Sequence, residues 1–296
     1  MLVHPGFDPV AISIGPIDIR WYGIMYLAGF TLAWLLARYR ARQPGSGWQT
    51  SELPDLVIYG ALGIIIGARL GYMLFYNFSG FIAEPWSMFM IWKGGMSFHG
   101  GLLGGIIAMY LFSRKTGRSF FQVTDFVAPM GALGVMCGRI GNFINAELWG
   151  RPTDLPWGMV FPMVDMVPRH PSQLYQALLE GLLLFLILWF FSSRPRPRMA
   201  VSGLFCLGYG TFRFFVEFFR EPDAHLGFVL LDWMSMGQIL SLPMILFGAG
   251  LLFWAYRKQS PTPVEWQGGA NHAKRVASQR ETRGRKNGRP SRQKEE

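Results

Sequence analysis

The chain has 296 residues, of which 51% are hydrophobic and only 16% charged, and it contains 36 glycines and 11 tryptophans. No ordinary soluble domain of this length combines these values, so the composition excludes that class and indicates an all-α polytopic membrane protein. The two cysteines, Cys137 and Cys206, lie in apolar stretches without a CxxC pair, so they indicate neither a disulfide framework nor a redox compartment.

Seven apolar runs are long enough to cross the roughly 30 Å hydrocarbon core of a bilayer, which takes about 20 helical residues or somewhat fewer with snorkelling flanks. We predict spans, in chain order, over residues 21–37, 53–75, 96–112, 120–140, 175–191, 200–219 and 234–256. Residues 1–10 contain no lysine or arginine and lead into no short apolar core with a cleavage site, so no cleaved signal peptide is expected.

Lysine and arginine gather in every second connection, at residues 38–42, 114–118 and 194–198, and again after the last span. By the positive-inside rule these segments face the cytoplasm, and an odd number of spans leaves the N-terminus in the periplasm. The opposite connections face the periplasm, and the longest of them, 141–174, is predicted to be a structured loop region. Residues 1–256 would then form one seven-helix transmembrane domain.

Residues 257–296 hold 11 of the 28 lysines and arginines but only 4 of the 18 acids. Such a run could bind nucleic acid, but its place directly after an apolar segment favours a cytoplasmic anchor at anionic lipid headgroups. The bilayer, and no nucleic acid, is therefore the expected partner. The polar composition of this tail predicts disorder.

Glycines recur every fourth residue at Gly63, Gly67 and Gly71, and in the pairs 100 and 104, 101 and 105, and 134 and 138. This spacing lets helices approach closely, and packing is a sufficient explanation for it.

Ionisable side chains fall in or at the edge of the predicted spans, where each costs about 3 kcal/mol at the bilayer centre unless it faces a protein interior or a wet cavity. They are Arg69, His99, Asp125, Arg139, Glu180, Arg213 and Glu217. One such pair could be structural, but this number predicts a shared polar cavity.

The sixth span carries a polar column, because Tyr209, Arg213 and Glu217 recur every four residues. On a helix this spacing places a phenol, a guanidinium and a carboxylate on one face, which must point inward. Glu217 can pair with Arg213, and we favour that supporting role over direct catalysis.

The stretch GRIGNFINAELWG, residues 138–150, places Arg139, Asn142, Asn145 and Glu147 where the fourth span meets the periplasmic face. Its small residues permit close approach of a ligand to the backbone. A guanidinium fork suits a phosphate bidentately, so Arg139 and Arg213 together could clamp a phospholipid phosphodiester.

His99 lies among glycines in GGMSFHGG at the start of the third span. A lone membrane histidine is more often a packing residue than a base, but this setting leaves the two interpretations equally open. The histidines and cysteines lack metal-ligand spacing, and no GxSxG, P-loop or dinucleotide motif occurs, so neither a metal nor another cofactor is implied.

Other classes of protein stay open at this stage. Intramembrane charges and glycine-broken helices also mark transporters, although no inverted repeat is visible. An intramembrane protease would need Ser97 or Ser202 with His99, and Ser97 lies only two residues from the histidine, a poor spacing for a dyad. A purely structural scaffold leaves the ionisable cluster unexplained.

GRIGNFINAELWG resembles the signature of the prolipoprotein diacylglyceryl transferases. Other segments similar to that family cover nearly the whole body: WYGIMY, GARLGYMLFYN, GGMSFHGG, RSFFQVTDF, RHPSQLYQ and GYGTFRFFVEFFREPD. The sequence departs from the pattern at Ala146, where glycine is expected, and at Gln176, where an acid often follows HPSQLY.

The resemblance implies an enzyme of the bacterial inner membrane, with its active site toward the periplasm. Such an enzyme moves the diacylglyceryl group of phosphatidylglycerol to the lipobox cysteine of a prolipoprotein, forming a thioether and releasing glycerol phosphate. It also implies that His99 and Arg139 are essential, with Arg139 at the lipid headgroup. Further positions that match functional ones are Tyr209, Arg213, Tyr22, Asn142 and Glu147.

The implied reaction needs a thiolate from a thiol of pKa about 8.5 and a neutralised phosphodiester leaving group. We hypothesise that Arg139 and Arg213 hold the phosphate while His99 accepts the thiol proton. The catalytic candidates are thus His99, Arg213 and Tyr209. The substrate-binding candidates are Arg139, Asn142, Glu147, Tyr22, Asn145 and Glu217. Alternatively, a strongly positive site lowers the pKa of the cysteine by itself and leaves His99 a positioning role.

Overall fold

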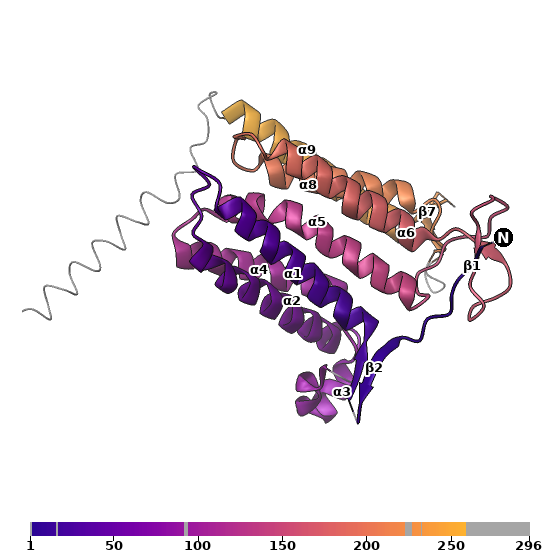
Figure 1. Cartoon of the computed structure of the whole chain (residues 1–296). Coiled ribbons are helices and arrows are strands. Elements are labelled where there is room, and N and C mark those ends of the chain that lie inside the picture. Colours follow the sequence, from indigo (N-terminus) through magenta and orange to yellow (C-terminus); the bar gives the residue numbers. More distant parts are fainter. Residues whose placement is uncertain (1, 16, 92–93, 223–226, 232, 259–296) are drawn as a thin grey trace, which may run out of the picture. The chain divides into compact units, whose positions relative to one another are not determined.

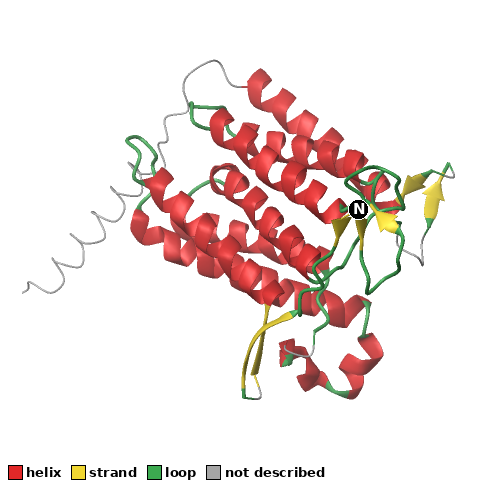
Figure 2. Ribbon diagram, turned by 45° about the vertical axis from the view of Figure 1, so that its right-hand side comes forward, coloured by secondary structure: helices red, strands yellow, loops and turns green. Residues whose placement is uncertain are grey.

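The computed structural model describes residues 2–258 apart from residues 16, 92–93, 223–226 and 232, so the predicted basic tail lies outside the described residues from 259 onward. The described chain is mostly helical (Figure 2), and each predicted apolar run contains a helix. By length and composition, Thr50–Phe75, Phe120–Ile144, Ser172–Phe191 and Met236–Lys258 qualify to cross a membrane; Ala200–Val216 is apolar but shorter. These features are those of a polytopic membrane protein.

The chain divides into two compact units, each described here by itself. Among the described residues, the first unit comprises 2–37 and 121–258, and the second comprises 38–120. Most of the candidate site residues lie in the first unit, whereas His99 lies in the second.

Helices of the first unit (Figure 1) are α1 (Trp21–Ala41, which continues into the second unit), α5 (Phe120–Ile144), α6 (Ser172–Gln176), the π-helical segment η4 (Ala177–Leu183), α7 (Leu184–Phe191), α8 (Ala200–Val216) and α9 (Met236–Lys258). The segments α6, η4 and α7 are continuous and begin directly after Pro171, a residue that suits a helix start because it has no N–H to satisfy. The predicted span over 175–191 therefore starts three residues too late.

The core of the first unit is apolar and tightly packed. Ala132, Leu184, Leu188 and Val201 form a buried cluster that joins α5, α7 and α8. The helices α8 and α9 lie side by side (Figure 1), and a Cβ added at Gly203 would lie 3.1 Å from the Gly248 carbonyl oxygen of α9. Small residues thus allow the two backbones to approach closely.

Short strands accompany the helices, which the all-α prediction did not include. A three-stranded sheet has the order β1 (Leu2–Val3), β4 (Met159–Val160) and β5 (Pro168–Arg169), with β1 parallel to β4; β2 (Val10–Ile14) pairs antiparallel with β3 (Ile17–Arg20), and β6 (Phe228–Leu230) with β7 (Met234–Ser235). Strands of two to five residues show too few alternations for sequence periodicity to reveal them.

The second unit consists of the helical segments η1 (Thr50–Glu52), α2 (Leu53–Phe75), α3 (Phe78–Ala83), η2 (Pro85–Phe89) and α4 (Phe98–Thr116). Glycines bring α2 and α4 into backbone contact, since a Cβ added at Gly71 would lie 2.8 Å from the Cα of Gly100. The packing interpretation is therefore confirmed for Gly63, Gly67, Gly71, Gly100 and Gly104. Gly101 and Gly105 make ordinary contacts with α2, and Gly134 lets α1 approach, since a Cβ added at Gly29 would lie 3.5 Å from its Cα. The interpretation is not supported for Gly138, where an added Cβ would meet nothing within 4 Å.

Two neighbouring glycines of α4 give a matched test of this packing. A Cβ at Gly104 would lie 2.9 Å from the Cα of Gly67, whereas one at Gly105 would lie 3.4 Å from the flexible Ile64 side chain. We expect Gly104→Ala to lower the free energy of unfolding by about 1–3 kcal/mol through overpacking. Gly105→Ala is expected to be neutral or to stabilise by up to about 1 kcal/mol through helix propensity. Unfolding in detergent micelles measures both, and equal effects would contradict the backbone contact.

Candidate active site

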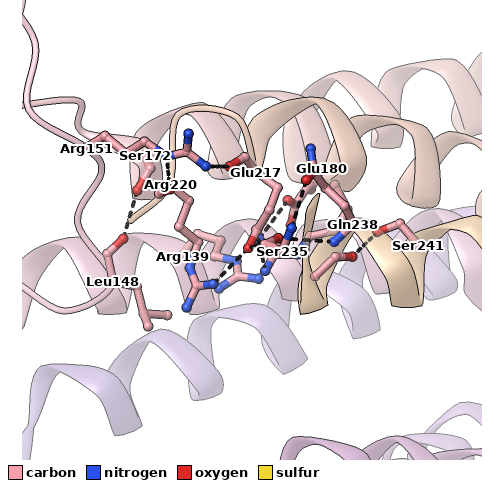
Figure 3. Close-up of polar contacts among 12 residues, drawn as sticks. Arg139, Leu148, Arg151, Ser172, Glu180, Glu217, Arg220, Ser235, Gln238 and Ser241 are labelled. Atoms are coloured by element: carbon pink, nitrogen blue, oxygen red, sulfur yellow. Dashed lines mark hydrogen bonds and ion pairs between the residues drawn. The ribbon is translucent and has the colours of Figure 1, made fainter. Parts of the chain in front are cut away.

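Arginines and glutamates alternate through the interior of the first unit (Figure 3). Arg139 Nη2 lies 3.5 Å from Glu180 Oε2, and Arg213 Nη1 lies 3.8 Å from Glu180 Oε1. Arg213 Nη2 lies 2.9 Å from Glu217 Oε2, and Arg220 Nη1 lies 3.1 Å from Glu217 Oε1. We call these five residues the arginine–glutamate chain; it joins α5, η4 and α8 with the turn after α8.

The two carboxylates of this chain are deeper than its guanidiniums. The side chains of Glu180 and Glu217 are 0% and 1% exposed, whereas those of Arg139 and Arg213 are 18% and 17% exposed. A buried carboxylate is tolerated only when opposite charges and hydrogen bonds compensate its lost hydration. The arrangement therefore keeps the anions inside and leaves parts of the cations accessible to a ligand.

Glu217 is the more tightly held of the two carboxylates. Besides both arginines, it accepts a hydrogen bond of 2.9 Å from the Ser235 hydroxyl. A Cβ added at Gly237 would lie 2.7 Å from its carboxyl carbon, so the glycine makes room for it. The Arg213–Glu217 pair expected from the four-residue spacing is present, and this bonding suits the supporting role that we favour for Glu217.

Tyr209 extends the polar column one turn earlier along α8. Its hydroxyl lies close enough to the Arg139 guanidinium to interact with it, so a residue of α8 approaches one of α5. The start of α8 is fixed by Asp125, whose carboxylate accepts hydrogen bonds from the Met199 and Ser202 amides, both at 2.8 Å. Asp125 thus acts as a helix cap for α8.

The end of α5 arranges the amides of the signature stretch around one carboxylate. Asn142 Nδ2 donates to Glu147 Oε2 at 3.2 Å, and Asn145 Nδ2 donates to Glu147 Oε1 at 3.3 Å. Ala146 and Leu148, on either side of Glu147, have φ angles of 52° and 57°. Glycine adopts this left-handed region without strain, which explains why the family pattern calls for glycine at position 146.

Tyr22 of α1 packs against the same stretch. A Cβ added at Gly141 would lie 2.9 Å from the Tyr22 ring, so only glycine permits this contact. The Tyr22 hydroxyl is close enough to interact electrostatically with both Arg139 and Glu147. Within the first unit, the structure therefore brings Tyr22 and the signature residues to the arginine–glutamate chain.

The loop after the signature is fastened to this site by polar contacts, some of which Figure 3 shows. Ser172 Oγ donates to the Leu148 carbonyl at 2.8 Å, and Gln173 Nε2 donates to the Glu147 carbonyl at 2.6 Å. Arg151 Nε donates to the Arg220 carbonyl at 3.0 Å. Segments far apart in the sequence, 147–151, 172–173 and 217–220, are thereby fixed relative to one another.

Burial and neighbouring charges shift the pKa values of titratable groups in this loop, Asp165 and His170 among them. The hydrogen bond from Arg169 holds the pKa of the Asp165 carboxyl below its usual value. Burial, and then the charge of Arg151, lower the pKa of His170. His170 Nδ1 lies 3.2 Å from the Tyr175 hydroxyl. Both shifts are explained by contacts that hold the loop together.

His99 occupies the first turn of α4 in the second unit, and its side chain is exposed. Ser97 caps this helix by accepting a hydrogen bond of 3.2 Å from the Gly100 amide. Gly94 and Gly95, just before the cap, have φ angles of 79° and 76°, which explains the glycines of the GGMSFHGG motif.

Arg69, another of the predicted intramembrane charges, holds the segment before His99. Its guanidinium donates to the carbonyls of Gly94 and Gly95, and to those of Met88 and Met90 at 3.1 Å each. Arg69 is therefore accounted for by a structural role within the second unit.

Several members of this site were not predicted from the sequence. Glu180 was recognised only as an intramembrane acid without a partner, and Arg220 and Ser235 were not singled out at all. Arg220 lies three residues after Glu217, a helical spacing that could have indicated the pair. No local pattern could have indicated Glu180, because its partners come from α5 and α8.

The fold and the site together define a polytopic membrane protein with a buried, partly accessible cationic cluster. A model of the prolipoprotein diacylglyceryl transferase family matches residues 9–254. The chain belongs to this family.

Curated relatives named phosphatidylglycerol–prolipoprotein diacylglyceryl transferase match nearly the whole chain. The protein of Oleidesulfovibrio alaskensis is 61% identical over 265 residues, covering 90% of this chain and 99% of the relative. That of Coxiella burnetii is 60% identical over 257 residues, with coverages of 87% and 98%. That of Pseudomonas fluorescens is 57% identical over 264 residues, with coverages of 88% and 98%.

Proposed function

We propose that this protein is a transferase that moves the diacylglyceryl group of phosphatidylglycerol onto a cysteine thiol of a prolipoprotein. Membership of the family and the names of relatives about 60% identical to it support this activity. The structural observation that carries the proposal is the pair of partly accessible arginines, Arg139 and Arg213, beside the same buried carboxylate. Such a pair suits a phosphodiester at headgroup depth.

In this reaction the lipobox thiolate attacks glyceryl C3 of phosphatidylglycerol. A C–S bond forms, the C–O bond to the phosphate breaks, and glycerol phosphate leaves with the bond's electron pair. The negative charge that grows on the leaving phosphate lies where guanidinium donors stabilise it most, which lowers the barrier. Arg139 and Arg213 supply these donors, and Tyr209, which interacts with Arg139, helps to fix their geometry.

The remaining candidates bind the headgroup and handle the proton. Glu147 is exposed and oriented by two asparagine amides, so its carboxylate is a suitable acceptor for glycerol hydroxyls. His99 takes the thiol proton as a general base. The alternative, in which the positive site alone favours the thiolate and His99 positions a substrate, gives a different pH profile.

The seven-span topology is part of the same proposal. Two observations support it: each of the seven apolar runs contains a helix, and the connections 38–42, 114–118 and 194–198 are basic, as cytoplasmic connections usually are. The N-terminus and the end of α5 then face the periplasm, with residues 1–256 as the transmembrane catalytic domain and 257–296 as a cytoplasmic tail. This places the active site toward the periplasmic side of the bacterial inner membrane.

Incubation of the purified protein with phosphatidylglycerol and a lipobox peptide, followed by mass spectrometry, tests the activity. We expect the peptide cysteine to gain one diacylglyceryl group, and Arg139→Ala to reduce the rate by about 10²–10³. Arg194→Ala, an exposed arginine in a connection predicted to be cytoplasmic, is the control and should retain the wild-type rate. A folded wild-type protein that leaves the peptide unmodified would overturn the proposal and direct attention to lipid transport.

A further inference from the structure

Glu180 reaches the arginines through an unusual piece of helix. It lies in the π-helical segment η4, a geometry that occurs mostly as short insertions and often at functional sites. The next residue, Gly181, faces α5 so closely that an added Cβ would lie 2.8 Å from the Cα of Met136. The wide turn and the glycine together bring the Glu180 carboxylate beside Arg139 of α5.

The contacts of Glu180 differ in kind from those of Glu217. Its oxygens lie 3.5 Å and 3.8 Å from Arg139 and Arg213, beyond the usual hydrogen-bond range, although the side chain is fully buried. Among the described residues, no donor forms a hydrogen bond of good geometry with either oxygen of Glu180, although the Gln176 side chain lies close enough to interact with the carboxylate. The carboxylate attracts both guanidiniums without saturating their N–H donors, and a ligand can reach the exposed parts of the two side chains, 18% for Arg139 and 17% for Arg213.

The charges of the arginine–glutamate chain do not cancel. Three guanidiniums face two carboxylates, a net charge of +1. Arg151 and Glu147, which lie beside the arginine–glutamate chain, carry opposite charges and leave this sum unchanged. One phosphodiester carries a single negative charge and balances it. A phosphate monoester, whose second pKa is about 6, carries two negative charges at pH 8 and exceeds it. Without the charge of Glu180 the net charge of these residues would be +2, which matches the phosphate monoester instead.

We propose, in an inference that rests on the proposed function, that Glu180 is a positioning residue that sets the net charge of the arginine–glutamate chain. It holds Arg139 and Arg213 beside each other for the monoanionic phosphodiester of the lipid, and its buried charge opposes retention of the dianionic glycerol phosphate product. Glu180 thereby couples binding of the substrate to release of the product.

The test compares two inhibitors, monoanionic glycerophosphoglycerol and dianionic glycerol phosphate, at pH 8. In Glu180→Gln we expect inhibition by glycerol phosphate to strengthen about tenfold relative to inhibition by glycerophosphoglycerol. We also expect kcat to fall about tenfold while KM for phosphatidylglycerol stays the same or decreases, because product leaves more slowly. A loss of stability alone would not move the ratio of the two inhibition constants.

Two further variants separate charge from structure. Glu180→Asp keeps the charge, so its inhibitor ratio should equal that of the wild type even though kcat falls with the shorter side chain. Asp125→Asn removes another buried carboxylate of the first unit, one that caps α8, and should lower stability without changing the ratio.

An unchanged ratio in Glu180→Gln, alongside an active wild type, would overturn this inference and leave the proposed function standing. If Glu180→Gln does not fold, a ratio shifted toward glycerol phosphate in Glu180→Asp would overturn it instead. An inactive wild type would overturn the proposed function itself.

Discussion

Glu217→Ala is expected to lower the free energy of unfolding by about 3–5 kcal/mol, because it removes a buried carboxylate that forms ion pairs with two guanidiniums. Glu217 is 1% exposed and lies between Arg213 and Arg220, at 2.9 Å and 3.1 Å. Both guanidiniums would lose the ion pair that each forms with Glu217. Equilibrium unfolding in mixed micelles measures the change.

Glu221→Ala is the matched control for this loss. Glu221 follows on the same turn and also pairs with an arginine, Arg169, at 3.3 Å, but its side chain is 45% exposed. Exposed pairs contribute at most about 1 kcal/mol, so this variant should remain close to the wild type. Similar losses in the two variants would mean that burial does not determine the importance of Glu217.

The helices could be predicted from sequence because crossing or lining a membrane demands long apolar runs. The second predicted span, 53–75, coincides with α2 (Leu53–Phe75). Helix ends were predicted less well, since they depend on caps and tertiary contacts. The sixth predicted span, 200–219, includes three residues beyond α8, which ends at Val216.

Only some of the ionisable residues predicted to share a polar cavity lie together in the structure. Arg139, Glu180, Arg213 and Glu217 do come together in the first unit. Asp125 instead caps α8, and Arg69 binds backbone carbonyls in the second unit. A charge within an apolar run predicts that a partner is needed. The sequence does not indicate whether this partner is a side chain or the backbone, because that depends on how the helices pack.

Pairs within one helix could be read from the sequence, whereas pairs between helices could not. The spacing of Arg213 and Glu217 fixes their contact through helix geometry alone. The contact of Arg139 with Glu180 depends on the register between α5 and η4, which Gly181 and the π-helical turn determine. The residue that lies between both arginines was therefore the one to which sequence analysis gave no role.

His99→Gln is expected to reduce the transfer rate by about 10²–10⁴ near pH 7, the usual contribution of a general base. Glutamine has a similar size and keeps hydrogen-bonding groups, but it cannot accept a proton at this pH. A free thiol has a pKa of about 8.5, so solvent supplies the thiolate increasingly above that pH. The loss should therefore shrink as pH rises from 7 to 9, and a rate profile of both proteins over this range measures it.

His170→Gln is the control, because His170 lies on the loop after the signature and its contact with Tyr175 is structural. Its pH profile should follow that of the wild type, which would show that the change in slope belongs to His99 alone. A loss in His99→Gln that stays constant from pH 7 to 9 would contradict proton transfer by His99. The histidine would then position a substrate at the start of α4, and the positive charge around Arg139 would have to favour the thiolate without a base.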